Sequence, residues 1–354
     1  MSARAKVLVV GPSWVGDMVM AQALYRVLSA RVPAPELHVL APPWSLPLLA
    51  RMPEVTKAIE LAAGHGELKL RLRRALGVSL RAERYRQAIV LPRALKAALV
   101  PWFARIPQRT GFRGEWRYGL LNDVRELDRV RLDQTVKRFV ALGLDDNAEL
   151  PSELPAEWRP RLRLDDANLA RLRQEHGVGG EAVVALMPGA EYGPAKRWPA
   201  ASYAALARSL AKAGRAVLLL GSAKERGLGE DIRVSAASAR VRNLCGQTTL
   251  GDVVDLLAGA DAAVSNDSGL LHVAAAAGTP VVAIYGSSSP TFTPPLTARA
   301  TILYRGIECS PCFARECPLG HLSCLREIEP GQVLDAVERA LATPRARAAG
   351  AAGD

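Results

Sequence analysis

Short apolar runs alternate with helix-length segments along almost the whole chain, and this alternation limits the possible folds more than any other feature. The first half has three runs with the composition of buried strands, at Lys6–Val10, Leu37–Leu40 and Gln87–Leu91. The second half has four more, at Ala182–Met187, Ala216–Leu220, Ala262–Ser265 and Val281–Tyr285. Strands separated by helices form parallel sheets. The sequence therefore predicts an α/β protein.

The alternation stops in the middle of the chain. From Leu150 to Arg163 the sequence loses its period and is rich in residues typical of irregular connections, namely Pro151, Pro155, Trp158 and Pro160. We interpret this segment as a linker between two Rossmann-like, doubly wound domains, expected at residues 1–160 and 161–342. Residues 343–354, rich in Ala and Arg, are expected to form a disordered tail. A length of 354 residues suits two domains of ordinary size.

The segment from Pro188 to Pro199 is the first candidate binding site. It follows a predicted strand, is rich in Gly and Pro, and carries Lys196 and Arg197. In open α/β sheets, ligands bind at the carboxyl ends of the strands. Glycine lets the backbone approach a ligand closely, and the two cations favour an anion such as a diphosphate. Lys196 lies in an irregular loop rather than on a solvated helix, which favours a binding role.

A second strand-to-helix junction indicates the same kind of ligand. The predicted strand ending at Ser265 is followed by Asn266-Asp267-Ser268-Gly269-Leu270-Leu271-His272 and an Ala-rich helix to Ala277. Asp267 or Ser268 is a suitable N-cap, and the free N–H groups of a first helical turn attract phosphate. The alternative for Asp267 is that it only caps the helix and binds no ligand. The spacing of His272 fits a core histidine as well as a ligand contact.

A third junction, from Gly11 to Asp17, follows the first predicted strand. It lacks the Gly-Lys-Ser/Thr end of a P-loop and the Gly-x-Gly-x-x-Gly pattern of a dinucleotide-binding fold. Its last residue, Asp17, is a poor phosphate ligand but a suitable general base. The alternative is that the charge of Asp17 only stabilises the first helical turn.

Several sequence blocks resemble the ADP-heptose:lipopolysaccharide heptosyltransferases of glycosyltransferase family 9. The blocks are Gly11–Met18, Arg51–Val55, Arg109–Glu115, Arg117–Asp123, Pro188–Pro199 and Asn266–Leu270. The last two narrow the resemblance to the type II branch, which adds the second heptose. The resemblance extends from about Lys6 to Leu341, and several blocks in the right order are far more specific than any single one.

The resemblance implies a fold and a reaction. The fold is the glycosyltransferase-B fold, in which two Rossmann-like domains face a cleft, the first binding the acceptor and the second the ADP-sugar. The reaction is inverting transfer of L-glycero-D-manno-heptose from ADP-heptose onto the first heptose of heptosyl-Kdo2-lipid A. This step belongs to inner-core biosynthesis of the lipopolysaccharide of the Gram-negative outer membrane.

The resemblance also implies roles for particular residues. Asp17 is the implied base, and Lys196 is implied to assist catalysis at the leaving diphosphate. The expected donor-binding residues include three from loops that follow predicted strands, Gly189, Ala190 and Ser222. The resemblance adds the donor-binding residues Lys196, Asp267, Ser268, Gly269 and His272.

No metal ion or cofactor is expected at this site. Many glycosyltransferases hold a divalent metal on an Asp-x-Asp motif, and the sequence contains none. Elsewhere, one irregular segment holds His321 and a cluster of cysteines, Cys309, Cys312, Cys317 and Cys324. Only the first two cysteines have ligand-like spacing, so two interpretations stay open: a structural zinc site, or free thiols bracing a loop near the acceptor.

The net charge of +11 is partly concentrated in the first half of the chain. Basic residues gather between Lys69 and Arg86, and a second group comprises Arg105, Arg109, Arg113 and Arg117. A basic surface attracts anionic lipid headgroups at about 1 kcal/mol per cation. The alternative is that the basic residues between Lys69 and Arg86 only form a solvated helix face. The expected acceptor-binding residues are Arg71, Arg73, Arg74 and Arg113. With 5% aromatic residues and no aromatic–basic platform, nucleic-acid binding is not expected.

No apolar run approaches the ~20 residues needed to cross a bilayer, and the N-terminus lacks a long apolar signal region. We therefore expect a cytoplasmic protein, peripheral at the cytoplasmic face of the inner membrane, where the phosphorylated glycolipid acceptor lies.

Other functions stay open at this level. A type I heptosyltransferase or another family member would use a different acceptor. A nicotinamide-dependent oxidoreductase is disfavoured by the missing glycine pattern. A non-catalytic protein binding anionic lipid or nucleic acid would explain the charge but leave Asp17 and Lys196 without a role. Neither the adenine-reading residues nor the oligomeric state is indicated.

Overall fold

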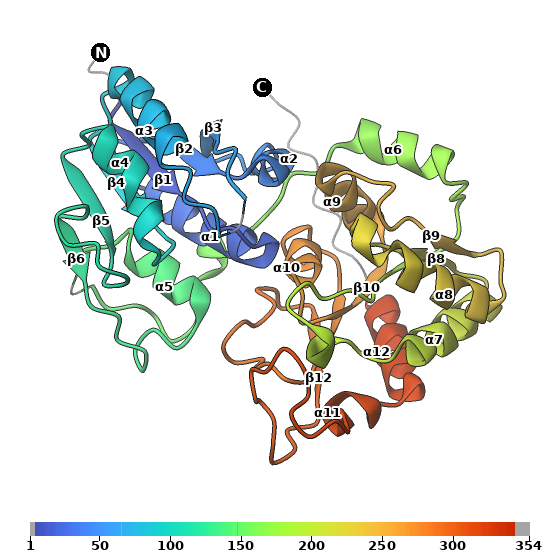
Figure 1. Cartoon of the computed structure of the whole chain (residues 1–354). Helices are drawn as coiled ribbons and strands as arrows, with labels where there is room; N and C mark the ends of the chain where they lie inside the picture. The colour runs from blue at the N-terminus through green and yellow to red at the C-terminus, as the bar shows by residue number, and fades with distance from the viewer. Residues whose placement is uncertain (1–3, 65, 147, 344–354) are drawn as a thin grey trace. The chain divides into compact units, whose positions relative to one another are not determined.

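The computed structural model describes residues 4–64, 66–146 and 148–343, which divide into two compact units (Figure 1). Unit 1 contains the chain up to Asp165 together with residues 249–254 and 289–297. Unit 2 contains residues 166–248, 255–288 and the chain from 298 onward. Each unit is described by itself. Apart from Thr343, the tail expected at 343–354 lies outside the described residues.

Unit 1 is built on a sheet of six parallel strands in the order β3-β2-β1-β4-β5-β6. This is the doubly wound order, in which the chain moves outward in one direction from β1 and then in the other from β4. The strands are β1 (Lys6–Val10), β2 (Glu36–Ala41), β3 (Val55–Glu60), β4 (Gln87–Val90), β5 (Gln108–Phe112) and β6 (Asp123–Arg125).

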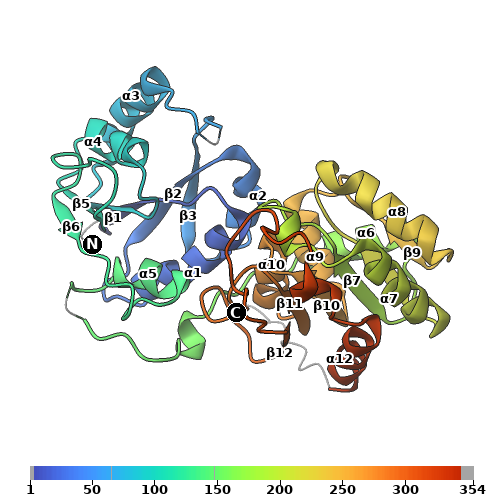
Figure 2. The same ribbon diagram turned by 60° about the horizontal axis from the view of Figure 1, so that its bottom comes forward.

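Helices cover both faces of the unit 1 sheet. In Figure 2, α3 and α4 lie on one side of it and α1 and α5 on the other. The helices are α1 (Val15–Ser29), α2 (Leu46–Leu49), α3 (Leu70–Ser79), α4 (Leu99–Phe103) and α5 (Thr135–Ala141). Short 3-10 turns lie at Pro43–Ser45, Leu80–Glu83, Leu95–Ala98 and Ala156–Trp158.

Unit 2 repeats the same topology. Its six parallel strands have the order β12-β11-β10-β7-β8-β9, so that β7 and β10 are the central pair. The strands are β7 (Val183–Met187), β8 (Ala216–Leu219), β9 (Val241–Asn243), β10 (Ala262–Asn266), β11 (Val281–Tyr285) and β12 (Ala300–Tyr304).

The helices of unit 2 also divide between the two faces. Helices α7, α8 and α12 share one apolar core with the sheet. Helices α9 and α10 connect strands in the opposite direction, and right-handed crossovers place them on the other face. The helices are α6 (Asp166–Glu175), α7 (Ala200–Lys212), α8 (Arg226–Ala236), α9 (Leu250–Gly259), α10 (Gly269–Ala276), α11 (Ser323–Arg326) and α12 (Pro330–Ala342), with 3-10 turns at Pro194–Lys196 and Ala223–Glu225.

The predicted α/β fold is confirmed, and every strand expected from the sequence is present with its ends within one residue. The strands that the sequence did not indicate are β3, β5, β6, β9 and β12. These strands are short or partly exposed, and β3 has a single buried residue, Ile59. A strand that buries few of its side chains has no continuous apolar run, so the hydrophobic pattern of the sequence does not reveal it.

The segment expected to be a linker is fixed to α1. Gln22 is fully buried, and its Nε2 donates to the Arg161 carbonyl at 2.7 Å while its Oε1 accepts from the Arg161 amide at 2.9 Å. One turn further along α1, Arg26 Nε donates to the Glu157 carbonyl at 2.6 Å. Side chains of α1 therefore hold the segment around residues 157–161 to the core of unit 1, and they bond backbone groups that no helix or strand pairs.

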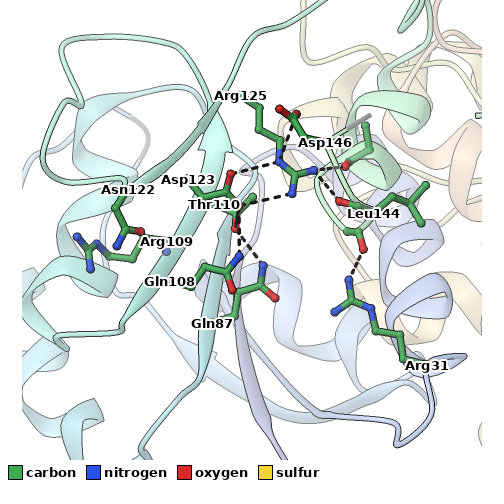
Figure 3. Close-up of polar contacts among 12 residues, drawn as sticks. Arg31, Gln87, Gln108, Arg109, Thr110, Asn122, Asp123, Arg125, Leu144 and Asp146 are labelled. Atoms are coloured by element: carbon green, nitrogen blue, oxygen red, sulfur yellow. Dashed lines mark hydrogen bonds and ion pairs between the residues drawn. The ribbon is translucent and has the colours of Figure 1, made fainter. Parts of the chain in front are cut away.

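Polar side chains close the edge of the unit 1 sheet beside β6 (Figure 3). Thr110 Oγ1 accepts from Gln87 Nε2 at 2.9 Å and donates to Asp123 Oδ2 at 2.8 Å, so three neighbouring strands are joined by side chains. Arg125 Nη1 donates to the carbonyls of Ala141 and Leu144, both at 2.7 Å, which fixes the end of α5 against β6. These bonds hold the edge strand β6 to its neighbour β5 and to the end of α5.

The contact between α3 and α4 generates a stability prediction, because it depends on the small size of Gly77. A Cβ at Gly77 would lie 2.5 Å from Phe103 Cβ and 2.7 Å from the Val100 carbonyl oxygen. We expect Gly77→Ala to lower the free energy of unfolding by roughly 1–3 kcal/mol through overpacking, measured by urea denaturation. The matched control is Gly227→Ala on α8, where an added Cβ meets nothing within 4 Å. Equal stabilities of the two variants would contradict this packing.

Candidate functional site

The central strands β7 and β10 of unit 2 define its candidate binding edge. They are hydrogen-bonded neighbours, and the connections that follow them leave on opposite faces of the sheet. Such a switch point leaves a crevice outside the carboxyl ends of the strands, where open α/β sheets bind ligands. The Lys196 loop, defined as Pro188–Pro199, follows β7, and the N-terminus of α10 follows β10. The structure therefore brings two of the three predicted junctions together.

Lys196 and Asp267 form a buried ion pair at this edge. Lys196 Nζ lies 2.5 Å from Asp267 Oδ2, and the side chains are 18% and 5% exposed. The ammonium also lies 5.1 Å from the centroid of the Tyr192 ring, within the range of a cation–π contact. Asp267, the residue after β10, therefore holds Lys196 in place, and the two charges of the pair sum to zero.

Asn266, the last residue of β10, holds the Lys196 loop to the sheet. Its side chain is fully buried, and its Nδ2 donates to the Pro188 carbonyl at 2.8 Å. Its Oδ1 accepts from the Trp198 amide at 2.9 Å and from the Tyr203 hydroxyl at 3.1 Å. One side chain thus binds both ends of the loop. Sequence analysis assigns Asn266 no role, although an amide at the end of an otherwise apolar buried strand is the signal that could have indicated one.

The N-terminus of α10 presents backbone donors at the same edge. Ser268 occupies the N-cap position, but its side chain makes no capping bond and instead lies 3.1 Å from Ser265 Oγ. The Ser268 side chain therefore does not occupy the N–H groups at the start of the helix, which are donors of the kind that bind anions.

His272 lies in α10 below these donors. It is 5% exposed, and burial lowers its pKa although the Asp267 carboxylate opposes this shift. The imidazole is therefore neutral near pH 7 and adds no positive charge to the site.

The loop after β8 approaches the Lys196 loop through Glu225. The Glu225 carboxylate accepts from the backbone N–H of Ser222 at 2.7 Å and from its hydroxyl at 3.0 Å. The same carboxylate lies over Gly189, where an added Cβ would be 1.6 Å from Glu225 Oε1. A larger residue at position 189 would require the Glu225 carboxylate to move. Ala190 beside it is 2% exposed and accepts from Arg197 Nη2 at 3.2 Å, so Arg197 is turned toward the backbone.

Asp17 belongs to unit 1. It lies in the first turn of α1 directly after the β1 junction and is partly buried. The tight approach of this junction to the sheet is fixed by Gly11, whose amide donates to the Leu40 carbonyl at 2.9 Å. A Cβ at Gly11 would lie 2.8 Å from Met18 Cε. The base assignment for Asp17 stays a prediction.

The expected acceptor-binding arginines differ in their surroundings. Arg71 and Arg74 are exposed on α3, and Arg113 is exposed with its Nη1 2.7 Å from Glu126 Oε1. Arg73 is only 4% exposed, and its Nε donates to the Leu68 carbonyl at 2.7 Å. Burial lowers its pKa. Arg73 therefore supports the start of α3 and does not present its charge to an acceptor, contrary to the expectation from the sequence.

The clustered cysteines line one small cavity in unit 2, together with Ala195, Ser287 and His321. All of them are free thiols. Burial raises the pKa of Cys324, whereas backbone N–H groups, that of Leu322 first, lower the pKa of Cys317. Within residues 4–64, 66–146 and 148–343, no group of three or more His, Cys, Asp or Glu side chains is placed to hold a metal ion.

The cysteine loop, defined as Cys309–Cys324, packs against the Lys196 loop. The Ala195 amide donates to the Arg315 carbonyl at 3.0 Å, and the Tyr192 hydroxyl donates to the Phe313 carbonyl at 2.8 Å. The sequence had suggested a loop near the acceptor. The structure places this loop beside the candidate donor site in unit 2, and its nearness to an acceptor stays a prediction.

The two doubly wound units have the glycosyltransferase-B fold, and the family match places the chain among the glycosyltransferases. More narrowly, the chain belongs to glycosyltransferase family 9. The family model described as glycosyltransferase family 9 (heptosyltransferase) matches residues 73–323.

Curated relatives and a solved structure agree with this family. The lipopolysaccharide heptosyltransferase 2 of Salmonella typhimurium is 46% identical over 339 residues, covering 93% of this chain and 97% of that protein. The lipooligosaccharide heptosyltransferase 2 of Haemophilus influenzae is 46% identical over 306 residues, covering 84% and 88%. The structure of Escherichia coli ADP-heptose lps heptosyltransferase II matches with a TM-score of 0.85 and 44% identity, covering 95% of this chain and 98% of that one.

Replacing Asn266 tests whether it fixes the Lys196 loop. We expect Asn266→Ala to lower the free energy of unfolding by about 2–4 kcal/mol, because several buried partners lose their hydrogen bond, and to weaken ADP binding. Denaturation and calorimetric titration with ADP measure the two effects. Tyr203→Phe removes one bond to Asn266 but leaves the loop contacts, so it should lower stability only slightly and keep ADP affinity. Unchanged ADP binding in a folded Asn266→Ala protein would contradict the role.

Proposed function

We propose that this chain transfers L-glycero-D-manno-heptose from ADP-heptose onto the first heptose of heptosyl-Kdo2-lipid A, with inversion at the anomeric carbon. The observation that carries the proposal is the meeting of Lys196 and the α10 N-terminus at the switch point of unit 2. The choice of heptose as the transferred sugar is supported by relatives named heptosyltransferase 2, which are 46% identical over most of the chain.

Unit 2 supplies the groups that suit the ADP part of the donor. As the bond between the anomeric carbon and the diphosphate breaks, negative charge grows on the leaving phosphate oxygen. Lys196 and the first N–H groups of α10 are preorganised donors for that charge. The sequence has no Asp-x-Asp motif, so we assign the stabilisation to these groups and not to a metal held by such a motif.

Unit 1 supplies the residue proposed to activate the acceptor. The acceptor hydroxyl oxygen attacks the anomeric carbon from the face opposite ADP, and its proton passes to the Asp17 carboxylate. The position of Asp17 at a strand-to-helix junction supports this assignment. The alternative is that Asp17 only stabilises the first turn of α1 through the helix dipole.

The choice of the type II reaction follows from the pattern of relatives. The lipopolysaccharide heptosyltransferase 1 of Pseudomonas aeruginosa is 30% identical over 152 residues, which cover only 40% of this chain. The heptosyltransferase 2 of Salmonella typhimurium matches 93% of the chain at 46% identity. This difference favours an acceptor that already carries one heptose.

A transfer assay tests the proposed reaction and the base together. With ADP-heptose, heptosyl-Kdo2-lipid A and EDTA present, we expect wild-type turnover and a loss of roughly 100-fold or more in Asp17→Asn. The matched control is Asp166→Asn, which removes an acid from the first turn of α6 in the same way and should keep full activity. Equal activity of Asp17→Asn and wild type would leave Asp17 a helix-stabilising residue. No wild-type transfer to this acceptor would contradict the proposed function.

We further propose that α3 places the protein at an anionic membrane surface. No helix among the described residues is long and apolar enough to cross a membrane. On α3 and just before it, however, apolar and basic side chains are exposed together: Leu68, Leu70 and Leu72 alternate with Lys69, Arg71 and, further on, Arg74. Such a surface suits insertion among headgroups, with leucines contacting the acyl boundary and cations the phosphates.

Vesicle sedimentation tests the membrane proposal. The double variant Arg71→Glu/Arg74→Glu should bind phosphatidylglycerol-containing vesicles roughly tenfold or more weakly than wild type, because each lost cation contributes about 1 kcal/mol. The control is Arg208→Glu/Lys212→Glu on α7, which makes the same charge change on another exposed helix face. If both variants lose binding equally, net charge alone explains the effect, and α3 is only a solvated helix.

A further inference from the structure

The Lys196–Asp267 pair leaves the proposed donor site short of positive charge. The ammonium and the carboxylate are 2.5 Å apart and largely buried, so their charges cancel. His272 adds no charge near pH 7, because burial lowers its pKa. A diphosphate diester is a dianion, and it becomes more negative when the sugar leaves. The helix N-terminus offers only partial positive charge, so the site needs a further cation.

Arg315 of the cysteine loop lies where such a cation is needed. Its guanidinium carbon lies 5.2 Å from the centroid of the Tyr192 ring, and Lys196 Nζ lies 5.1 Å from the same centroid. Two cations from distant parts of unit 2 thus share one aromatic platform. The Tyr192 hydroxyl donates to the Phe313 carbonyl at 2.8 Å, which fixes the ring between the two loops.

The backbone of Arg315 is fixed to the Lys196 loop. Its carbonyl accepts from the Ala195 amide at 3.0 Å, directly before Lys196. The approach is so close that a Cβ at Gly193 would lie 2.4 Å from the same carbonyl oxygen. The cysteine loop is also tied to the end of β11, since the Phe313 amide donates to the Ser287 carbonyl at 2.6 Å. Arg315 therefore keeps a defined place beside Lys196.

The charge of Arg315 is not used elsewhere in the described structure. The side chain is exposed, and no ion pair is found for it among the residues that the structure describes. Arg197, the other arginine next to Lys196, is also exposed, but its Nη2 donates to the Ala190 carbonyl at 3.2 Å. Arg315 is thus the cation with the freedom to bind a phosphate.

We propose that Arg315 binds the diphosphate of the nucleotide-sugar donor together with Lys196, and that it stabilises the leaving nucleoside diphosphate. The inference rests on the proposed function and adds a residue to its donor site. A planar guanidinium can stack on Tyr192 and still donate hydrogen bonds to phosphate oxygens in its plane.

Calorimetric titration with ADP and with adenosine tests the proposal, since only ADP carries phosphate. Arg315→Gln should weaken ADP binding about tenfold, which corresponds to about 1.4 kcal/mol, and leave adenosine binding unchanged. Arg315→Lys should recover part of the loss, because it keeps the charge but not the stacked plane. The matched control is Arg326→Gln, which removes the same charge from an exposed position on α11 and should bind ADP like wild type.

Two results would overturn the proposal. One is wild-type ADP affinity in Arg315→Gln, and the other is an equal loss of ADP and adenosine binding, which would indicate a distorted loop. Tyr192→Ala should reproduce the selective loss of ADP binding, since it removes the platform. A wild-type protein that binds ADP but transfers no heptose would contradict the proposed function while leaving the Arg315 result valid.

Discussion

The candidate site depends on one buried ion pair, between Lys196 and Asp267. It joins the loop after β7 to the residue after β10, so it fixes the two chain segments that form the switch point of unit 2. Removing either partner would leave an unpaired charge in a mostly buried place, which is strongly destabilising. The pair therefore positions the ammonium. Because the pair carries no net charge, we propose that a bound diphosphate also uses donors from α10 and the cysteine loop.

Hydrogen bonds in the surrounding structure hold this ion pair in position. Asn266 uses its amide to hold both ends of the Lys196 loop, and Tyr192 connects that loop to the cysteine loop. These contacts are side-chain bonds to backbone groups, which satisfy a loop that lacks a strand partner. The same solution recurs in unit 1, where Gln22 holds the end of the long N-terminal segment to α1. In both units the parallel sheet supplies the platform and buried amides fix the connections.

Much of the fold could be predicted from sequence because the central strands are continuous apolar runs such as Val281–Tyr285, whereas edge strands such as β3 are mostly exposed. The junctions that carry Lys196 and Ser268 were recognisable because strand ends, glycines and caps have local signatures. Whether a cationic side chain is exposed or buried could not be recognised from the sequence. Arg73 and Arg71 are two residues apart in one basic run, yet Arg73 is buried against the Leu68 carbonyl and Arg71 is exposed. The roles of Asn266 and Arg315 depend on contacts between segments that are far apart in the sequence, and local sequence patterns do not reveal such contacts.

A crystal structure of the protein with ADP bound would show directly where the diphosphate lies. We expect the β-phosphate to lie within hydrogen-bond distance of Lys196 Nζ and of the first N–H groups of α10, at the carboxyl ends of β7 and β10. A β-phosphate bound away from these groups, for example at the Gly11–Asp17 junction of unit 1, would contradict the assignment of the donor site to unit 2.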